Sequence, residues 1–365
     1  MKLSREEQLS KRFYILNAVV SVMLLVVIVV SVFQFGAHTF ESRRTIGMVL
    51  PDKITDTGWN KSQYDGMRKA AEDLNYNLVT MEDVKTDKQS LNEAVDALVK
   101  RRAKTIFFAN CENLNAAFEV ASHHPNISFY GIEAEKSDIP MKKYFVRYAE
   151  AYYLAGIIAG LRTVTEKVGF ISPGSSPGLN QMVNAFTLGV RKIKPNAQVY
   201  ISYTGAFKAP TLEEQAVRDM KAHNADVIAY FADGATIAEA AARARIDFIS
   251  LFNSTKSAHN LATIMVNWQG IYKTLFRREV QGGGSVYIAS VMDRGVEVIL
   301  NKHLDARGRA IFEAEVFEIK EGKNIFTGPI WDNRGILRVK ENEIISNKSL
   351  DKMSYLAQGV ITLGN

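Results

Sequence analysis

A tryptophan and an asparagine stand side by side where an α/β protein would place a ligand site. Trp59 and Asn60 follow an apolar run, residues 45–50, and precede an amphipathic run, residues 67–74. The first run predicts a strand and the second a helix, so residues 56–66 are expected to form a loop at the strand's carboxyl end. An indole face can stack on a planar ring, and an amide can both donate and accept hydrogen bonds. The pair favours a planar, polar ligand, with the alternative that Trp59 is a core residue of the helix.

Further polar residues stand where later strands are expected to end. The carboxyl ends of parallel strands share one edge of a sheet, so these residues would face a common cleft. For each of them, a role as a simple loop residue or a helix cap stands equally beside contact with the ligand. Backbone N–H groups at helix starts in the same cleft would favour polar or anionic ligand groups. The residues are Asn110, Cys111, Glu112, Glu133, residues 203–207, Asp233, Gly234 and Asn253.

Motifs for catalysis, phosphate binding and metal binding are not found. The sequence has no GxGxxG fingerprint, and the glycine run 282–284 has no lysine where a phosphate loop needs one. No Cys/His group has zinc-ligand spacing, and the one cysteine, Cys111, excludes an intrachain disulfide. Residues 172–178 form a turn-rich loop in which no acid–base partner for a serine can be named. We therefore expect no enzyme activity, no cofactor and no metal ion.

The net charge of +6 is spread along the chain in short clusters. Pairs such as Arg101-Arg102 and Arg277-Arg278 lie at expected helix ends with acidic residues nearby. We interpret them as solvated surface and expect no nucleic-acid partner. A basic balance also suits a protein that is held near an anionic membrane.

Residues 15–35 are apolar enough and long enough to cross a bilayer as a helix. Residues 1–14 carry Lys2, Arg5, Lys11 and Arg12 against Glu6 and Glu7. The positive-inside rule then places residues 1–14 in the cytoplasm and the chain after Gly36 outside the cell. A cleaved signal peptide is the rival interpretation, but Phe-Gly-Ala at residues 35–37 fits a cleavage site poorly. The sequence favours a single-pass signal anchor, followed by a linker at residues 36–44.

The rest of the chain alternates between short apolar runs and segments with helical periodicity. Further strands are expected at residues 78–81, 105–109, 128–132, 145–148, 168–171, 199–203, 227–231, 248–252 and 286–290. Helices are expected at residues 91–101, 114–122, 151–162, 180–193, 212–223 and 237–244. This alternation predicts parallel sheets with right-handed crossovers, and the number of strands exceeds one compact unit.

A break near residues 144–150 divides the pattern into two similar halves. We therefore predict an α/β fold with two doubly wound, Rossmann-like lobes that close on a small ligand. The first lobe is expected at residues 45–148 plus about 250–290, and the second at residues 149–249 plus about 291–365. The tail from residue 317 predicts short strands and turns packed on one lobe.

Several stretches, taken in order, carry a family resemblance. They are residues 56–66, 150–156 leading into 167–171, Phe186 with Gly189 and 195–196, 202–207, 225–228 with 233–234, and 328–332 with 359–360. Together they resemble the basic membrane protein or purine-nucleoside-receptor (PnrA-like) family, the substrate-binding proteins of ABC importers. The resemblance covers about residues 44–362 and implies the type I periplasmic-binding-protein fold.

The resemblance also implies roles for individual residues. In the family an aromatic at the position of Trp59 stacks on a nucleobase, and a second aromatic from the other lobe covers the opposite face. Phe231 is the candidate for that second ring, with Phe207 behind it. Asn60 resembles the reader of the base edge, and Asp52 stands where the family has a ligand-binding aspartate. The expected ligand-binding set is Asp52, Trp59, Asn60, Asn110, Glu133, Phe207, Phe231, Asp233, Gly234 and Asn253.

The sequence departs from the family at the expected sugar contacts. The family usually has an acidic ribose contact near residue 253 and a lysine near residue 266, but here residues 252–254 are Phe-Asn-Ser and residues 265–268 are Met-Val-Asn-Trp. Glu133 also stands at a position that is usually aspartate. These differences bear on the ribose contacts and on nucleoside specificity.

The resemblance implies an extracytoplasmic protein that presents a nucleoside-like ligand to an importer, with a permease and an ATPase as partners. The alternative is a membrane-anchored sensor or regulator of the same family that has no transport role. An enzyme such as a nucleoside hydrolase would need an acid–base or metal set that the sequence does not offer.

Overall fold

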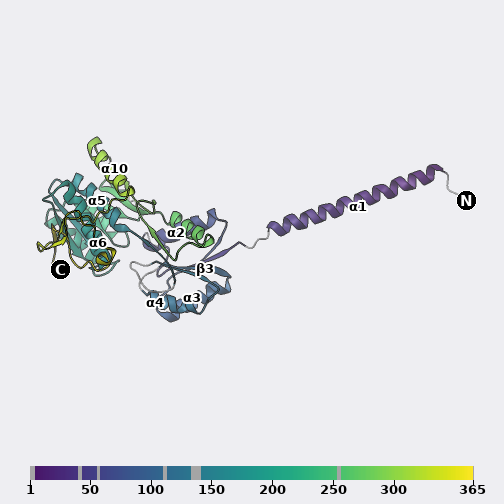
Figure 1. Cartoon of the computed structure of the whole chain (residues 1–365), viewed down its shortest axis with the longest axis horizontal. Coiled ribbons are helices and arrows are strands. Elements are labelled where there is room, and N and C mark those ends of the chain that lie inside the picture. Colours follow the sequence, from purple (N-terminus) through teal and green to yellow (C-terminus); the bar gives the residue numbers. More distant parts are fainter. Residues whose placement is uncertain are drawn as a thin grey trace. The chain divides into compact units, whose positions relative to one another are not determined.

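The chain separates into two compact units, Met1–Arg44 and Thr45–Asn365. The computed structural model describes residues 5–39, 43–55, 58–109, 113–132, 141–252 and 256–364 (Figure 1). The first unit is the single helix α1 (Arg5–Thr39). Its apolar part, Phe13–Ser31, has a mean hydropathy of 2.8 and is long enough to cross a membrane. The second unit holds all the strands of the described chain.

A six-stranded parallel sheet forms the first lobe, in the order β11-β5-β4-β3-β1-β2. Its strands are β1 (Thr45–Val49), β2 (Asn77–Met81), β3 (Ala103–Phe108), β4 (Ser128–Ile132), β5 (Lys142–Val146) and β11 (Val286–Ala289). Its helices are α2 (Trp59–Asp73), α3 (Lys88–Lys100), α4 (Leu114–Ser122) and α9 (Trp268–Val280). Figure 1 shows α2 on one side of β3 and α3 with α4 on the other, as a doubly wound sheet requires.

The strands of the first lobe bury side chains on both faces. In β1, Met48 packs in the core that includes Met67 of α2, while Val49 packs in the core that includes Leu91 of α3. Because successive side chains of a strand point to opposite faces, a strand covered by helices on both sides reads as a continuous apolar run. This is why residues 45–50 predicted a strand correctly from sequence.

The second lobe is built on a seven-stranded sheet in the order β12-β10-β9-β8-β6-β7-β15, parallel except where β12 pairs with β10. Its strands are β6 (Lys167–Ser172), β7 (Gln198–Tyr203), β8 (Val227–Tyr230), β9 (Asp247–Leu251), β10 (Asn260–Val266), β12 (Val296–Leu300) and β15 (Val360–Thr362). Its helices are α5 (Tyr148–Arg162), α6 (Pro177–Ile193), α7 (Pro210–Ala222), α8 (Thr236–Ala244), α10 (Ala306–Lys320) and α11 (Asn347–Leu350). The short strands β13 (Ile330–Trp331) and β14 (Leu337–Val339) pair separately.

Two glycines let α5 and α6 touch backbone to backbone. A Cβ on Gly156 would lie 2.1 Å from the carbonyl oxygen of Phe186, and a Cβ on Gly189 would lie 2.1 Å from that of Tyr153. Both distances are far below van der Waals contact, so neither position tolerates a larger residue without separating the helices. The close approach gives a packing reason for two glycines in the stretches that resemble the family.

The chain crosses between the lobes three times, after β5, after β10 and after β11. The crossings are tied to one another by hydrogen bonds. Arg147 N–H donates to Ala289 O at 2.8 Å, and Asn267 N–H donates to Gly295 O at 2.9 Å. The buried carboxylate of Glu150 accepts from Val291 N–H at 3.0 Å. The first crossing falls in the break expected at residues 144–150.

The lobe boundaries differ from the expected ones in one place. The sequence places residues 250–290 in the first lobe, but β10 pairs with β9 in the second sheet. The return to the first lobe therefore begins with α9, after residue 266. A strand's apolar pattern reports burial, and it does not say which of two similar sheets the strand will join.

Several element ends also differ from the expectation. The strand expected at residues 145–148 is Lys142–Val146, and Tyr148 already begins α5. The tail is helical as far as Lys320 in α10 and then forms the expected short strands, of which β15 pairs with β7. Helix and strand ends are the least certain part of a pattern-based assignment, because neighbouring elements decide them.

The expected loop at residues 56–66 is largely a helix. Helix α2 begins at Trp59, and its buried face includes Asn60, Gln63 and Gly66 as well as Met67 and Ala70. These positions have helical spacing, but three of them are not apolar. Apolar periodicity therefore predicted only the second half of the helix.

Candidate functional site

The amino end of α2 in the first lobe meets the loop after β8 in the second lobe. The backbone N–H of Trp59 donates to Asp233 Oδ1 at 2.7 Å. The residue before the helix, Gly58, has no side chain that could cap it. Asp233 therefore supplies the cap from the other lobe, and its negative charge also suits the positive end of the helix dipole.

The backbones approach closely at this contact. A Cβ on Gly58 would lie 1.5 Å from Asp233 Oδ1 and 3.2 Å from the backbone nitrogen of Gly234. Any side chain at position 58 would have to displace the carboxylate. Gly234 has a φ of +108°, a conformation that strongly favours glycine. Two glycines and one carboxylate thus form the junction between the lobes.

The indole of Trp59 is fixed by a hydrogen bond at the carboxyl end of β3. Its Nε1–H donates to the carbonyl oxygen of Ala109 at 2.8 Å, and Gln63 Nε2 donates to the same oxygen at 3.1 Å. Gln63 Oε1 in turn accepts from the hydroxyls of Tyr272 at 2.6 Å and Tyr144 at 3.2 Å. This buried network fixes the plane of the Trp59 ring, which is itself only partly buried.

Phe252 is the aromatic residue of the second lobe that lies beside Trp59. The two ring centroids are 5.7 Å apart with an interplanar angle of 69°. Trp268, at the start of α9, lies 5.5 Å from Trp59 at 82°. Both are edge-to-face contacts, a favoured geometry for aromatic pairs. Trp59 thus belongs to an aromatic cluster between the two sheets.

Phe231 and Phe207 form a second aromatic group instead of facing Trp59 directly. Phe231 lies 5.9 Å from Phe207 and 5.3 Å from Tyr148 by ring centroids. The backbone N–H of Asp233 donates to Phe207 O at 2.6 Å, which joins this group to the junction. The structure therefore brings both expected phenylalanines to the carboxyl edge of the second sheet. It puts Phe252 in the place beside Trp59 where the sequence suggested Phe231.

Phe252 has an unusual backbone. Its φ is +64°, a left-handed conformation that is rare for a bulky residue. The side chain is buried, with 5% of its surface exposed. Such strain persists where surrounding contacts hold the residue in place, and it is concentrated at ligand sites. Sequence reasoning missed this residue because it looked like the last apolar position of a strand.

The remaining expected residues divide into two groups. Asp52 is exposed at the carboxyl end of β1 and accepts a hydrogen bond from Lys53 N–H at 2.8 Å. Asn60 is buried in the first turn of α2, with 3% of its surface exposed. The other group, Asn110, Glu133 and Asn253, lies outside the described residues, as do Cys111 and Glu112.

A second carboxylate lies behind Asp233. Glu213, in the first turn of α7, is buried, and its Oε1 accepts from Ala209 N–H at 2.8 Å. Burial raises the pKa of Glu213, hydrogen bonds from Ala209 and Thr236 oppose the rise, and the charge of Asp233 adds to it. The junction therefore has a buried carboxyl group next to the charged carboxylate of Asp233.

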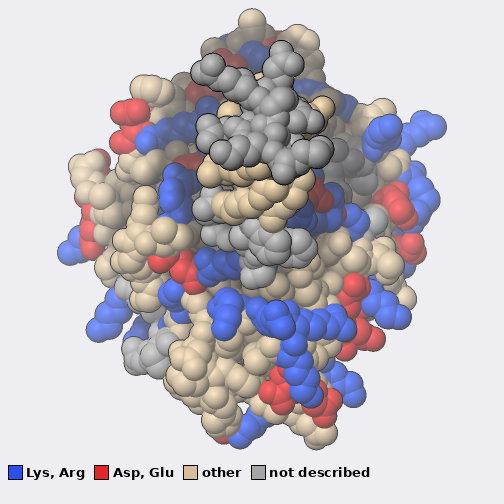
Figure 2. Space-filling view, turned by 90° about the vertical axis from the view of Figure 1, so that its right-hand side faces the viewer, with Lys and Arg blue, Asp and Glu red and all other residues tan. Residues whose placement is uncertain are grey.

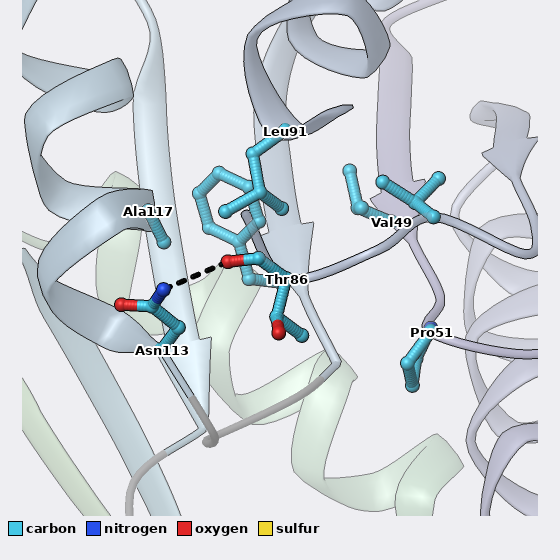
Figure 3. Close-up of a pocket in the computed structure, with 8 residues that line it drawn as sticks. Val49, Pro51, Thr86, Leu91, Asn113 and Ala117 are labelled. Carbon is cyan, nitrogen blue, oxygen red and sulfur yellow. Dashed lines mark hydrogen bonds between the residues drawn. The ribbon is translucent and has the colours of Figure 1, made fainter. Parts of the chain in front are cut away.

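Figure 3 shows a small pocket at the carboxyl edge of the first sheet. Val49 and Pro51 line it from the end of β1, and Asn113 lines it from the start of α4. Asn113 Nδ2 donates to Thr86 O at 2.9 Å, and Asn113 Oδ1 caps α4 through Ala116 N–H at 3.2 Å. The pocket measures about 20 Å³, which is room for about one water molecule. It is too small for a nucleoside and belongs to the wall of the lobe.

Residues 174–178 have the G-x-S-x-G spacing of a nucleophile elbow, so the expectation that the sequence has no such motif is wrong. Ser176 is the N-cap of α6 and accepts from Leu179 N–H at 3.3 Å. Helix capping accounts for a serine at this position. Within the described ranges, no group of three His, Cys, Asp or Glu side chains could hold a metal ion.

Two doubly wound lobes joined by three crossings form the type I periplasmic-binding-protein fold. The fold is similar to an ABC transporter solute-binding protein from Conexibacter woesei, with a TM-score of 0.65 and 16% identity over 76% of this chain and 97% of that one. The family described as "ABC transporter substrate-binding protein PnrA-like" matches residues 43–316. The chain belongs to this family, a class of solute-binding proteins and not of enzymes.

Two curated relatives are similar in sequence. A purine-binding protein of Brucella abortus is 24% identical over 337 residues, which are 89% of this chain and 95% of that protein. The transcriptional activator protein med of Bacillus subtilis is 26% identical over 190 residues, 52% of this chain and 58% of that protein. The family resemblance inferred from sequence is confirmed, as is the two-sheet α/β fold.

Proposed function

We propose that this protein binds a purine nucleoside-like molecule between its two lobes and presents it to an ABC importer. The observation that carries the proposal is the junction of Trp59, Phe252 and Asp233. An indole held at its nitrogen by Ala109 O keeps a fixed ring plane. A fixed aromatic plane between two lobes that can close suits a flat heterocycle, because stacking depends on orientation.

Similarity to a purine-binding protein over most of the chain supports the same class of ligand. The absence of the family's usual acidic and lysine sugar contacts, at residues 252–254 and 265–268, argues for recognition mainly through the base. We therefore expect purine nucleosides and free purine bases to bind with more similar affinities than in family members that keep those contacts.

Calorimetry on the purified full chain tests the ligand class. Adenosine, inosine and guanosine are titrated beside adenine, uridine and arabinose. We expect saturable binding of at least one purine compound and none of arabinose. Binding of a sugar without any purine would refute the nucleoside proposal and leave the family membership intact. Mass spectrometry of small molecules released from the denatured protein identifies the natural ligand.

A sensor without a transport role is the second candidate. Similarity to a transcriptional activator of Bacillus subtilis favours it. The two functions differ in their partners, since an importer needs a permease and an ATPase. Cross-linking of the native membrane protein followed by mass spectrometry separates them. Recovery of permease and ATPase subunits supports import, and recovery of a signalling protein without them supports the sensor.

We further propose that α1 remains attached as a single-pass anchor and that the Thr45–Asn365 unit lies outside the cell. The apolar part of α1 is preceded by four cationic side chains, Lys2, Arg5, Lys11 and Arg12, against two acidic ones, Glu6 and Glu7. This bias places the preceding residues in the cytoplasm.

A further inference from the structure

The amino edge of the first sheet carries a cluster of exposed cations. All neighbouring strands of this sheet run parallel, so their amino ends share the edge opposite to Trp59. Thr45 of β1 pairs in register with Ala103 of β3. The turn just before Ala103 therefore lies at the edge of the sheet where the chain enters β1. We call this cluster the basic edge; it consists of Lys100, Arg101, Arg102 and Lys104.

In the described part of the chain the basic edge has no ion-pair partner of its own, although Glu93 and Asp96 stand nearby in sequence. Residues 99–105 contain no acidic side chain. Lys100, Arg101, Arg102 and Lys104 are exposed. Among the residues that the structure describes, no ion pair involves any of these four, whereas Lys142 pairs with Glu279. On the face drawn in Figure 2, Lys and Arg side chains are spread among Asp and Glu side chains and are the more frequent of the two.

Helix stabilisation explains only part of the cluster. Lys100 is in the last turn of α3, where a cation interacts favourably with the helix dipole. Arg102 and Lys104 lie outside any helix and gain nothing from that dipole. Their charges repel one another at this spacing, and a counter-charge outside the chain would relieve the repulsion.

We propose that the basic edge docks on an anionic lipid surface, namely the membrane that α1 crosses. This inference rests on the proposed anchor. The chain enters the folded unit at this edge, since Arg44 precedes β1 directly. Residues 40–44 separate α1 from the described start of the unit, and a fully extended linker spans only about 3.5 Å per residue. The cations are thus tethered within reach of the lipid headgroups, where each Lys or Arg adds to binding.

Docking through this edge would fix the first lobe and leave the second lobe to move. The junction residues Trp59 and Asp233 stand at the opposite, carboxyl edge, away from the lipid. Ligand closure and membrane docking would therefore use different surfaces of the same unit.

Lysine footprinting on the full chain tests the proposal. The protein is reconstituted into vesicles of phosphatidylcholine alone or with about one third phosphatidylglycerol, and acetylation of each lysine is followed by mass spectrometry. We expect Lys100 and Lys104 to react about fivefold more slowly in the anionic vesicles. Lys340 and Lys348, exposed in the carboxyl-terminal segment, should be unchanged. The protection should vanish in about 1 M salt, where the Debye length is about 3 Å.

Charge reversal supplies the matched variants. Arg101→Glu with Arg102→Glu should abolish the protection of Lys104, while Arg101→Lys with Arg102→Lys should keep it. The control pair Arg307→Glu with Arg334→Glu changes two exposed cations of the second lobe and should have no effect. A thermal melt of each variant shows that the fold is intact.

Two outcomes would overturn the proposal. Equal protection in neutral and anionic vesicles would mean that tethering alone shields the lysines. Protection by soluble polyphosphate but not by anionic vesicles would make the partner a soluble polyanion. The footprint is taken without nucleoside, so a failed ligand proposal leaves its result unaffected.

Discussion

Trp59 combines a fixed ring plane with a partly exposed indole. Its nitrogen is bonded to Ala109 O, and its ring meets Phe252 and Trp268 edge to face. A residue that served only the core would be fully buried, as Tyr272 beside it is. At the scale of the single residue, the structure is therefore compatible with the stacking role that the sequence suggested.

We predict that Trp59→Ala weakens binding of a purine nucleoside by about tenfold to a hundredfold, because base stacking is worth roughly 1–3 kcal/mol. Trp59→Phe should keep most of the affinity. Ala109 O would lose the indole donor but would still accept from Gln63 Nε2. Calorimetric titration of the two variants measures the difference.

Thermal melting separates stacking from core packing. If Trp59 acted only in the core, Trp59→Ala would cost about 3–5 kcal/mol and lower the melting temperature by many degrees. Unchanged affinity in Trp59→Ala would rule out the stacking role.

The amino end of α2 is the element that links the two lobes. Its first N–H is capped by Asp233 from the loop after β8, and Gly58 gives the carboxylate the space to enter. The anion-binding potential that a helix start offers is therefore occupied by the protein's own side chain. We therefore no longer expect this helix end to bind an anionic group of the ligand.

A double-mutant cycle tests this cap. Asp233→Ala should destabilise the closed arrangement by about 0.5–2 kcal/mol, the usual cost of losing an N-cap. Gly58→Ala should have an effect at least as large in the parent, because the new Cβ would displace the carboxylate. In the Asp233→Ala background the same glycine change should cost much less.

Small-angle scattering and urea unfolding provide the readouts of the cycle. We expect a larger radius of gyration for each single variant if the contact holds the lobes together. Additive effects of the two changes would show that Gly58 and Asp233 do not act through one another.

At the scale of the whole molecule, two buried carboxylates have opposite electrostatic surroundings. Glu315 of α10 binds Lys192 at 2.5 Å, Lys323 at 2.6 Å and Tyr153 at 2.9 Å. Burial alone would raise the pKa of Glu315, but these hydrogen bonds outweigh it and lower the pKa. At Glu213 burial is the largest effect and leaves the pKa raised, although hydrogen bonds from Ala209 and Thr236 and the charge of Lys208 lower it. The two groups should therefore contribute to stability with opposite pH dependence.

We predict opposite pH profiles for Glu315→Gln and Glu213→Gln. The lowered pKa of Glu315 gives stability that is present above its unfolded pKa of about 4.3 and is lost as pH falls. Glu315→Gln should thus cost about 3 kcal/mol near neutral pH and much less in acid. The raised pKa of Glu213 imposes a penalty that appears as pH rises, so Glu213→Gln should gain relative stability toward neutral pH.

Urea unfolding of both variants at about pH 4 and about pH 7 provides the measurement. Each variant is the control for the other, since both remove one buried negative charge. Parallel profiles would contradict the assigned surroundings of the two carboxylates.

The anchor is also a property of the whole molecule. We predict that the native protein keeps α1, so that amino-terminal sequencing of membrane-extracted protein reads residues before the apolar part of the helix. A mature terminus near His38 would show that the segment is a cleaved signal. The apolar length and the flanking charges motivate the expectation.

The sequence by itself determined the features that depend on local pattern. The apolar stretch of α1 follows from hydropathy, and the alternation of strands and helices follows from periodicity. The sequence also placed Trp59 and Asn60 shortly after the first strand, at the edge where loops after parallel strands meet. Their role in ligand binding stays a prediction. The family was recognised correctly because several short motifs occur in the family's order along the chain, even though overall sequence identity is low.

Tertiary structure alone decided the contacts that close over long separations. Asp233 and Trp59 lie 174 residues apart in sequence, and no local pattern pairs a carboxylate with a helix start in another lobe. No local pattern predicts that Phe252 lies beside Trp59 or that β10 joins the second sheet. Nor does one predict that α2 buries a polar face that includes Gln63. Periodicity reports whether a side chain is buried, whereas the partner that buries it is chosen by the packing of the whole chain.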